Sequence, residues 1–308
     1  MYKISSVLVL LSTYNGEKFL SEQLDSLLNQ INVNIHLLIR DDGSCDSTEL
    51  ILQKYSSKFS NVTIINGKNV GCKQSYCLLI DYAYNNLNSF DYYAFCDQDD
   101  VWEIDKLYIA VTKLNEISNS KKLYTSSYYV VDEKLKKLYI KVIKYRHTVG
   151  EALMMINTLG CTQVYSEEIF RLSAKRIKVP KSNISKMPNH DGWLYLISII
   201  NNAEIIYDET PHILYRQHQN NVVGANKSSI QTRFFRILAS RNIKSEIAKI
   251  LLELDYEIDK KTKVLLSLNS NYKKSFKTKF KLLFSKDMIT NSISVNIAYR
   301  LLILTNYF

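Results

Sequence analysis

The stretch ISSVLVLLSTYNGEKFLSEQLDSLLNQ, residues 4–30, changes from a strand pattern to a helix pattern. It begins with a short apolar run that favours a β-strand. After a polar break, side chains recur at helical spacing at Phe19, Leu20, Gln23, Leu24, Leu27 and Leu28. Because a strand followed by a helix of ten or more residues is the repeating unit of a parallel sheet, the stretch predicts the first unit of an α/β fold.

The same alternation continues up to about residue 102. Three further strands are predicted, at VNIHLLIR (33–40), NVTIIN (61–66) and DYYAFCD (91–97). Helices are predicted to open near residues 46–49, where Asp and Ser can cap free N–H groups, and to span 71–88. The predicted fold class is therefore α/β, with a Rossmann-like, mostly parallel sheet flanked by helices.

Beyond residue 102 the pattern is mixed, and it changes again near residue 226. Residues 103–118 and 190–200 predict helices, 122–132 a strand, 179–189 a loop, and 203–218 an extended segment or strand pair. We therefore expect one domain over 1–225, with halves 1–102 and 103–225, and a helical region over 226–308.

Composition and charge set further limits. The 308 residues are 46% apolar, with five cysteines and no CxxC pair, which predicts a folded chain with reduced thiols in the cytoplasm. The apolar run Val7–Leu11 is too short for a signal peptide core, and no segment reaches 18 uninterrupted apolar residues, so no membrane span is expected. The net charge of +10 comes entirely from 226–308, which holds 16 Lys or Arg against 6 Asp or Glu.

Polar clusters follow each of the first four predicted strands. They are Ser12–Gly16, Asp41–Ser44, Gly67–Gly71 and Asp97–Asp100. In a parallel sheet ligands bind beyond the carboxyl ends of the strands. Any single cluster is explained by the ordinary polarity of loops, but two acidic clusters at one edge favour a site for Mg²⁺ or Mn²⁺. Since no glycine-rich phosphate loop is present, a diphosphate would be held through its metal and through side chains.

These stretches together resemble a known family. VLVLLSTYNGEKFLSEQLDSLLNQ, LLIRDDGSCDST, NVGCKQSYCLLIDYA, FCDQDDVWEIDKL, HDGWLYLI and YRQHQNNVVG resemble family 2 glycosyltransferases of the GT-A fold. Among these, the chain is similar to bacterial rhamnosyltransferases and other enzymes of polysaccharide assembly. The resemblance covers residues 4–225 well and the remainder poorly.

The resemblance implies a role for each matching residue. Asp99 is implied as the metal ligand, while Asp100 and Trp102 would shape the loop beneath the donor sugar. Gln98 departs from a fully acidic triplet, so fewer charges would hold the ion. The donor nucleotide would be bound by Ser12, Thr13, Tyr14, Asp41, Asp42 and Asp97.

The second half supplies the other implied residues. Asp191 is implied as the catalytic base, although an aspartate there could instead be a helix N-cap. Arg216 would hold phosphate oxygens, and His218 would ligate the metal or contact the diphosphate, although alone it reads as an ordinary surface histidine. The acceptor side would include Trp193, Gly160 and Asn157. The adjacent Cys161 has the alternative interpretation of a small buried side chain.

The basic C-terminal region has three interpretations: a solvated helical face, a nucleic-acid patch, or an electrostatic membrane anchor. The segment 271–286 interleaves lysines with Phe276, Phe280, Leu283 and Phe284, a composition typical of an interfacial amphipathic helix. Because acceptors of such enzymes are often polyprenyl-linked sugars, we favour an anionic membrane surface. No nucleic-acid recognition motif accompanies the basic residues.

The sequence thus predicts an inverting, metal-dependent glycosyltransferase, peripheral on the inner face of the cell membrane. Its donor would be a nucleoside diphosphate sugar, first dTDP-rhamnose and second a UDP-hexose, and its acceptor a saccharide or polyprenyl-linked saccharide. Two alternatives stay open: a sugar nucleotidyltransferase, for which the chain lacks a glycine-rich triphosphate loop, and a non-catalytic scaffold subunit. The sequence leaves the oligomeric state open, a homo-oligomer included.

Overall fold

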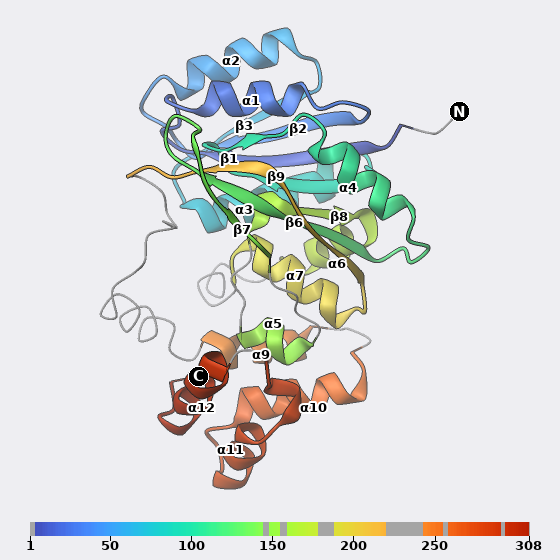
Figure 1. Ribbon diagram of the computed structural model, residues 1–308, viewed down its shortest axis with the longest axis vertical. Helices are drawn as coiled ribbons and strands as arrows, with labels where there is room; N and C mark the ends of the chain where they lie inside the picture. Colours follow the sequence, from blue (N-terminus) through green and yellow to red (C-terminus); the bar gives the residue numbers. More distant parts are fainter. Residues whose placement is uncertain are drawn as a thin grey trace. The chain divides into compact units, whose positions relative to one another are not determined.

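The computed structural model describes residues 4–143, 148–154, 159–177, 188–219, 243–254, 258–290 and 293–307. Two compact units interleave along the chain (Figure 1). The first contains residues 1–145, 159–178 and 203–225, and the second contains 146–158, 179–202 and 226–308. The domain boundary proposed after residue 225 stays a prediction.

The first unit is built on one sheet of nine described strands. In chain order they are β1 (Ser6–Thr13), β2 (Asn34–Asp41), β3 (Val62–Asn66), β4 (Tyr92–Cys96), β5 (Val101–Trp102), β6 (Lys122–Val131), β7 (Lys137–Lys141), β8 (Gln163–Ser166) and β9 (Glu204–Arg216). Their spatial order is β3-β2-β1-β4-β8-β6-β9-β5, and β7 pairs with β6.

Parallel pairing is concentrated in the first half of the sheet. Strands β3, β2, β1 and β4 are parallel to one another, and β6 is parallel to β9. Antiparallel pairs join β4 to β8, β8 to β6, β6 to β7 and β9 to β5. The expected α/β fold with a mostly parallel sheet is confirmed.

Successive side chains of β1 point to opposite faces of the sheet. Because successive strand residues point to opposite sides, Val7, Val9 and Leu11 join a core with apolar residues of α1 (Leu20–Leu28), α2 (Thr48–Lys58) and α4 (Lys106–Asn115). All five residues from Val7 to Leu11 are fully buried, as expected for a strand covered by helices on both faces.

The other face is covered by α3 (Cys72–Asn86) and α6 (Glu167–Ile177). An aromatic cluster fills this interface: Tyr93 of β4 stacks on Phe170 of α6 at 3.8 Å between ring centroids. Tyr76 of α3 meets the edge of Phe95, and its hydroxyl donates to the Cys96 carbonyl at 2.7 Å. These contacts fix the end of β4, from which the acidic loop begins.

The second unit is helical. Its elements are α5 (Val149–Met154), α7 (His190–Ile200), α9 (Ile243–Glu253), α10 (Lys260–Asn271), α11 (Phe276–Leu283), the 3-10 turn η3 (Lys286–Met288) and α12 (Ile293–Leu304). Its core contains Met154, Leu265, Tyr272, Leu282, Met288, Tyr299 and Ile303. A Cβ on Gly150 of α5 would lie 1.8 Å from the Asp287 carbonyl oxygen, so only glycine permits this approach.

Several predicted elements can now be compared with the structure. The helix predicted over 190–200 matches α7, and the helix predicted near 46–49 begins at Thr48. The segment expected as a strand pair or extended chain is one 13-residue strand, β9. Most of the loop predicted over 179–189 lies outside the described residues. Among the described helices, none is long and apolar enough to cross a bilayer.

Candidate active site

The carboxyl ends of β1, β2 and β4 meet at one edge of the sheet. Thr13 at the end of β1 is in register with Asp41 at the end of β2, and Leu11 is in register with Cys96 at the end of β4. The polar clusters that follow these strands therefore lie together, as ligand binding in a parallel sheet requires.

Hydrogen bonds join the loop after β1 to the loop after β2 and to Thr48, the first residue of α2. The Asn15 N–H donates to Ser44 Oγ at 2.9 Å, and the Cys45 N–H donates to Asn15 Oδ1 at 2.9 Å. The Gly16 N–H donates to Thr48 Oγ1 at 2.8 Å. Asn15 has a φ of 48°, a conformation that asparagine tolerates better than most residues. The two loops therefore form one preorganised surface.

Gln98 clamps the acidic loop to the loop after β1. Its Oε1 accepts from Thr13 Oγ1 at 2.7 Å and from the Tyr14 N–H at 2.8 Å. Its Nε2 donates to the Tyr14 carbonyl at 3.2 Å. A Cβ on Gly16 would lie 2.8 Å from Gln98 Oε1, so the glycine makes room for this clamp. The sequence showed only that Gln98 is uncharged; the bridging role required the fold.

Gln98→Ala is expected to lower the free energy of unfolding by about 1–3 kcal/mol, because the Thr13 hydroxyl and the Tyr14 N–H lose their acceptor. The donor KM should rise more than kcat falls, since the substitution loosens the loops without removing a reacting group. Thermal unfolding and steady-state kinetics measure both effects. Gln53→Ala, on the exposed surface of α2, is the matched control. Equal behaviour of the two variants would contradict the clamp.

Asp41 is the last residue of β2, Asp42 follows it, and both are buried. Asp41 accepts from Ser44, through its N–H at 3.1 Å and its hydroxyl at 2.5 Å. Asp42 forms an ion pair with Arg40 and accepts the Val70 and Gly71 N–H groups at 3.0 and 2.8 Å. The two carboxylates hold the loops after β2 and β3, and their predicted contact with the donor nucleotide stays a prediction.

Ser12 belongs to the same buried network. Its hydroxyl lies 2.5 Å from that of Ser75, which accepts from Arg40 Nη1 at 2.9 Å. Tyr14, by contrast, is 45% exposed at the edge of the sheet. Ser12, Thr13 and Tyr14 therefore lie in one region, and Tyr14 has the most exposed side chain of the three.

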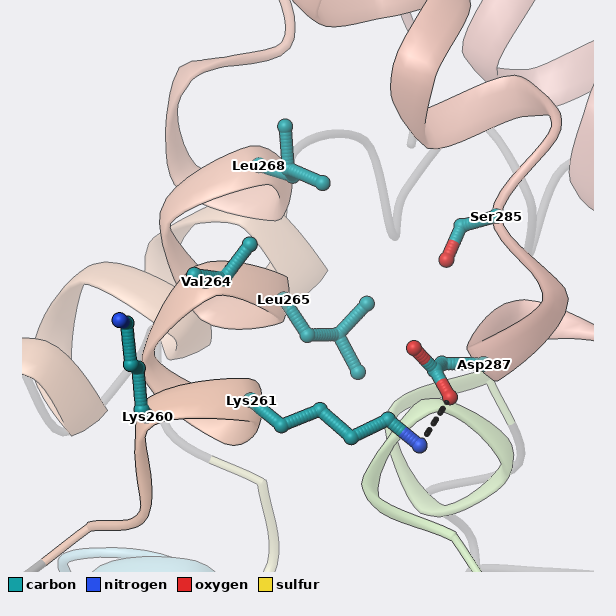
Figure 2. A pocket seen from close by; sticks show the side chains of 7 residues that line it. All are labelled: Lys260, Lys261, Val264, Leu265, Leu268, Ser285 and Asp287. Atoms are coloured by element: carbon teal, nitrogen blue, oxygen red, sulfur yellow. Dashed lines mark ion pairs between the residues drawn. The ribbon is translucent and has the colours of Figure 1, made fainter.

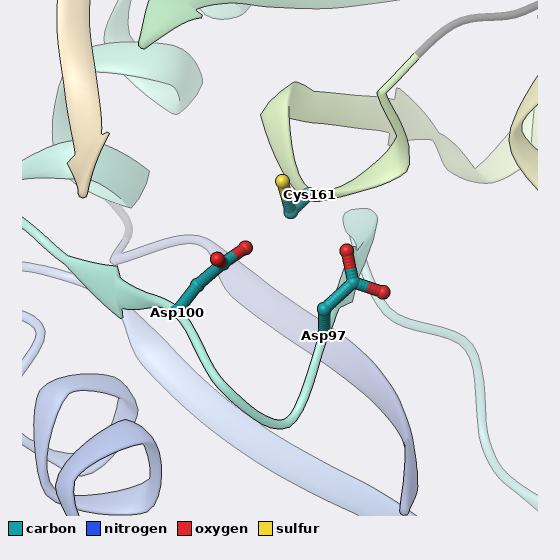
Figure 3. Close-up of side chains that lie close together, drawn as sticks. All are labelled: Asp97, Asp100 and Cys161. Atoms are coloured by element: carbon teal, nitrogen blue, oxygen red, sulfur yellow. The ribbon is translucent and has the colours of Figure 1, made fainter. Parts of the chain in front are cut away.

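The acidic loop after β4 separates its carboxylates into different environments. Asp97 and Asp100 lie at the two ends of the loop and face Cys161, whose 3-10 turn (η1, Gly160–Thr162) lies opposite (Figure 3). Ligand atoms of the three residues lie within 4.8 Å of one another. Asp100 accepts the Arg216 N–H at 3.1 Å, and its Oδ2 is buried with no hydrogen-bond partner among the described residues.

Both buried members of this cluster favour their protonated forms. Burial, followed by the neighbouring Asp99 and Asp97 carboxylates, raises the pKa of Asp100 well above its ordinary value. Burial, followed by Asp100 and Asp97, also raises the pKa of the Cys161 thiol. A thiol is also a soft ligand, which a hard divalent cation such as Mg²⁺ disfavours.

Asp99 has a different partner. Its Oδ2 lies 2.7 Å from His218 Nε2, just beyond the end of β9, and the two side chains are 15% and 10% exposed. The His218 ring packs on Phe19 with 4.9 Å between centroids. A carboxylate and an imidazole from distant segments thus meet at the surface of the acidic loop.

Arg216 anchors the acidic loop to its surroundings. Its Nε donates to the Asp99 carbonyl at 2.8 Å, its Nη1 donates to the Glu133 carbonyl at 2.6 Å, and its Nη2 pairs with Glu22. The guanidinium also lies 4.5 Å from the centroid of Phe19. These bonds position the backbone around Asp99, while the predicted contact of Arg216 with phosphate stays a prediction.

Lys106 lies beneath the same loop and is fully buried. Its Nζ lies 3.4 Å from the centroid of the Trp102 ring and has no hydrogen-bond partner among the described residues. Burial lowers the pKa of Lys106 from 10.5 to about 7. Trp102, expected to shape the loop, is itself buried beside this ammonium.

Lys106→Met is expected to raise the melting temperature most below pH 7. The unfolded chain binds the lysine proton up to about pH 10.5, whereas the folded chain releases it near pH 7. The wild-type free energy of unfolding therefore rises with pH between these values, and is most reduced below pH 7. The advantage of the variant should shrink as the pH approaches 10. Thermal unfolding across pH 6–10 measures this, and a pH-independent difference would contradict it.

Comparison with known proteins identifies the family. Residues 8–166 match the family described as Glycosyl transferase family 2. The chain is 31% identical over 246 residues to the dTDP-rhamnosyl transferase RfbG of Shigella flexneri, an alignment that covers 78% of this chain and 83% of the relative. The chain belongs to glycosyl transferase family 2. It spans 44% to 64% of the length of several other curated glycosyltransferases.

Solved structures support the GT-A fold of this glycosyltransferase. Staphylococcus aureus TarS (residues 1–349), in complex with UDP-GlcNAc, has a TM-score of 0.59 and 18% identity, covering 92% of this chain and 77% of that one. The mannosyltransferase PcManGT of Pyrobaculum calidifontis, in complex with GDP-Man and Mn²⁺, has a TM-score of 0.51 and 11% identity. That alignment covers 96% of this chain and 86% of the mannosyltransferase.

GT-A glycosyltransferases commonly use a divalent metal, and two groups of residues in this enzyme could hold one. Asp99 and His218 supply a carboxylate oxygen and an imidazole nitrogen, donors that suit Mn²⁺. Asp97, Asp100 and Cys161 form the more buried alternative. Because a thiol is a soft ligand, whereas carboxylate and imidazole donors suit Mn²⁺, the chemistry of the donor sets favours the first.

The predicted base of the glycosyltransferase, Asp191, lies in the second compact unit. The N-cap residue of α7 is Asn189, so Asp191 occupies the first turn rather than the cap. Its exposed fraction is 7%, and burial lowers the pKa of the adjacent His190 to about 3. Asp191 is therefore not the N-cap residue of α7, so that alternative is wrong. Its role as the catalytic base stays a prediction.

The predicted acceptor-side residues are divided between the units. Trp193 is buried in α7, and its Nε1 has no hydrogen-bond partner among the described residues. Gly160 opens the 3-10 turn of the first unit that carries Cys161. Asn157 lies outside the described residues.

Proposed function

We propose that this family 2 enzyme is an inverting, metal-dependent glycosyltransferase of cell-surface polysaccharide synthesis. The donor is dTDP-rhamnose, with a UDP-hexose as the second candidate. The observation that carries the proposal is the 31% identity to a dTDP-rhamnosyl transferase over 246 residues, an alignment that covers 78% of this chain. The alternative of a nucleotidyltransferase has no comparable support.

The donor nucleotide is proposed to bind beyond β1, β2 and β4. Tyr14, exposed at this edge, offers a ring face for the base, while Ser12 and Thr13 lie beside the ribose. Asp42 is held by Arg40 and by two backbone amides, so a contact with the base would involve a fixed carboxylate. Preorganisation of this kind lowers the cost of binding.

Asp191 is proposed to take the proton of the acceptor hydroxyl. The hydroxyl oxygen attacks the anomeric carbon from the face opposite the diphosphate, and the bond from that carbon to the diphosphate oxygen breaks. The diphosphate leaves with the bonding electrons, and the proton stays on the Asp191 carboxylate. A single displacement inverts the anomeric configuration and forms no sugar-enzyme intermediate.

Asp99 and His218 are proposed to hold Mg²⁺ or Mn²⁺. The bound ion would supply Lewis-acid stabilisation of the leaving diphosphate. Arg216 positions this pair through its bond to the Asp99 carbonyl, and Asp97 supports the ribose side of the loop. The uncharged Gln98 keeps the loop in place without adding a further charge.

The acceptor is proposed to be a saccharide, free or linked to a polyprenyl carrier. A lipid-linked acceptor would require the enzyme to work at a bilayer surface. We therefore propose a peripheral position on the inner face of the cell membrane. The positive charge of residues 226–308 supports this position, because anionic lipids attract basic segments.

A thermal-shift panel of sugar nucleotides tests the donor proposal. Ligands that bind the folded state raise its melting temperature. With Mn²⁺ present, dTDP-rhamnose should give the largest shift, and dTDP alone should give part of it. A larger shift with a UDP-hexose would replace the first donor by the second. No shift with any sugar nucleotide would support the scaffold alternative.

A further inference from the structure

The second unit exposes two apolar rows that its own packing does not require. The first lies on α11 and its C-cap, where Phe276, Phe280 and Phe284 are 82%, 54% and 57% exposed. The second lies on α12 and comprises Ile293, Ile297, Leu301 and Leu304, each more than half exposed. We call these residues the two-row surface.

Each row lies away from the face by which its helix packs into the unit. On α11 the buried residue is Leu282, and helical geometry places Phe276 and Phe280 on roughly the opposite side. On α12 the buried residues are Tyr299 and Ile303, while the exposed row recurs at intervals of four and three. Packing within the unit therefore accounts for the buried apolar residues of each helix. It does not account for the exposed apolar row on the other side.

The two helices are fastened to each other. The Tyr299 hydroxyl donates to the Leu282 carbonyl at 2.8 Å, and Lys279 Nζ donates to the Leu304 carbonyl at 2.7 Å. The phenyl rings also contact one another, with 4.6 Å between the centroids of Phe280 and Phe284. The rows therefore belong to one hydrogen-bonded helix pair.

The charge around the two rows indicates which kind of surface they would bind. On α11, Lys277 directly follows Phe276 and Lys281 directly follows Phe280. Lys273 and Lys274 precede the helix. From residue 260 to 308 the chain holds ten Lys or Arg and a single acidic residue, Asp287. An apolar row bordered by lysines complements an anionic surface with an apolar interior.

Two lysines at the start of α10 extend the positive charge. Lys260 and Lys261 border a pocket of about 380 Å³, lined also by apolar side chains of α10 (Figure 2). Lys261 is paired with Asp287 at 2.6 Å, which uses the single carboxylate of this region. With ten basic residues against one acidic residue, residues 260–308 carry a formal net charge of +9.

We propose that the two-row surface docks the enzyme on an anionic lipid bilayer, with the phenylalanines and the α12 row inserted among the acyl chains. The lysines beside them contact the lipid phosphates. The inference rests on the proposed membrane position of the enzyme and names the helix faces responsible. Neither helix is long enough to cross a bilayer, so both would lie in its interface.

The test is vesicle flotation of the purified full-length protein, without donor or metal. Vesicles contain either phosphatidylcholine with 30% phosphatidylglycerol, chosen as the anionic lipid, or phosphatidylcholine alone. The protein should float with the anionic vesicles and much less with the neutral ones. Phe276→Ser/Phe280→Ser/Phe284→Ser, and separately Ile297→Ser/Leu301→Ser, should each weaken binding by about tenfold or more. Lys277→Glu/Lys281→Glu should have a similar effect that vanishes in high salt.

Matched controls come from α2 of the first unit. Leu50→Ser removes an apolar side chain that is 68% exposed, and Lys54→Glu/Lys58→Glu reverses two exposed lysines. Both controls should bind anionic vesicles within twofold of the parent. All variants should keep the far-ultraviolet circular dichroism and the donor-induced thermal shift of the parent, because the altered side chains are exposed.

Three results would overturn the inference: no binding of the parent to anionic vesicles, equal binding to neutral ones, or unchanged binding of both serine variants. A dimer in light scattering that the same serine variants abolish would assign the surface to self-association instead. Because flotation needs no sugar nucleotide, its failure would leave the proposed transfer untouched. Conversely, loss of transfer would leave lipid binding intact.

Discussion

Asp191→Asn is expected to lower kcat by about a thousandfold or more while leaving the Kd for the nucleoside diphosphate sugar unchanged. General-base catalysis contributes on the order of 10²–10⁴-fold, and an amide cannot take the acceptor proton. The neighbouring His190, whose pKa burial lowers to about 3, is a poor substitute at neutral pH. Steady-state transfer and isothermal titration with the donor measure the two quantities.

The matched control for this variant is Asn189→Ala, which alters the N-cap position of α7 without touching the carboxylate. The control should keep most of the activity, since no side-chain hydrogen bond from Asn189 caps the helix. Unchanged turnover of Asp191→Asn would refute the role of the base. A large fall in the melting temperature of Asp191→Asn would instead assign the residue to folding.

Asp99→Asn and His218→Gln are each expected to reduce Mn²⁺-dependent donor binding by on the order of a hundredfold. Even residues that only orient a metal ligand change affinity by about 10–100-fold, and these two supply the proposed ligand atoms. Donor affinity without metal should change little. Titration with and without Mn²⁺ gives both values.

Cys161→Ala separates the two groups of candidate metal ligands. The thiol belongs to the group with Asp97 and Asp100 and is distinct from the pair of Asp99 and His218. If the pair holds the ion, Cys161→Ala keeps Mn²⁺-dependent binding. If Cys161→Ala loses that binding and Asp99→Asn keeps it, the metal site must be reassigned to the buried cluster.

The strand-helix alternation of residues 4–102 was predictable because periodicity reports burial directly. A strand covered on both faces must be apolar throughout, as Val7–Leu11 is. The order of the second half was not predictable, since β8 and β9 insert between or beside strands distant in sequence. Nothing local in those segments specifies which neighbour they pair with.

The sequence predicted where the site lies in the fold. It did not predict most of the side-chain contacts within the site. Loops at the carboxyl ends of β1, β2 and β4 had to meet, whatever their details. The clamp made by Gln98 and the burial of Lys106 depend on side chains from separate elements, which no spacing reveals. The exposed row on α12 was also missed, because an apolar helix gives no sign of which face it buries.

The most direct test of the proposed function is transfer from dTDP-rhamnose to lipid-linked saccharide acceptors in the presence of Mn²⁺. The purified enzyme should release one dTDP for each sugar transferred, and nuclear magnetic resonance of the product should show inversion at the anomeric carbon. Turnover should fall to background in Asp191→Asn. Retention of configuration, or turnover unaffected by both Asp191→Asn and removal of divalent metal, would contradict the account.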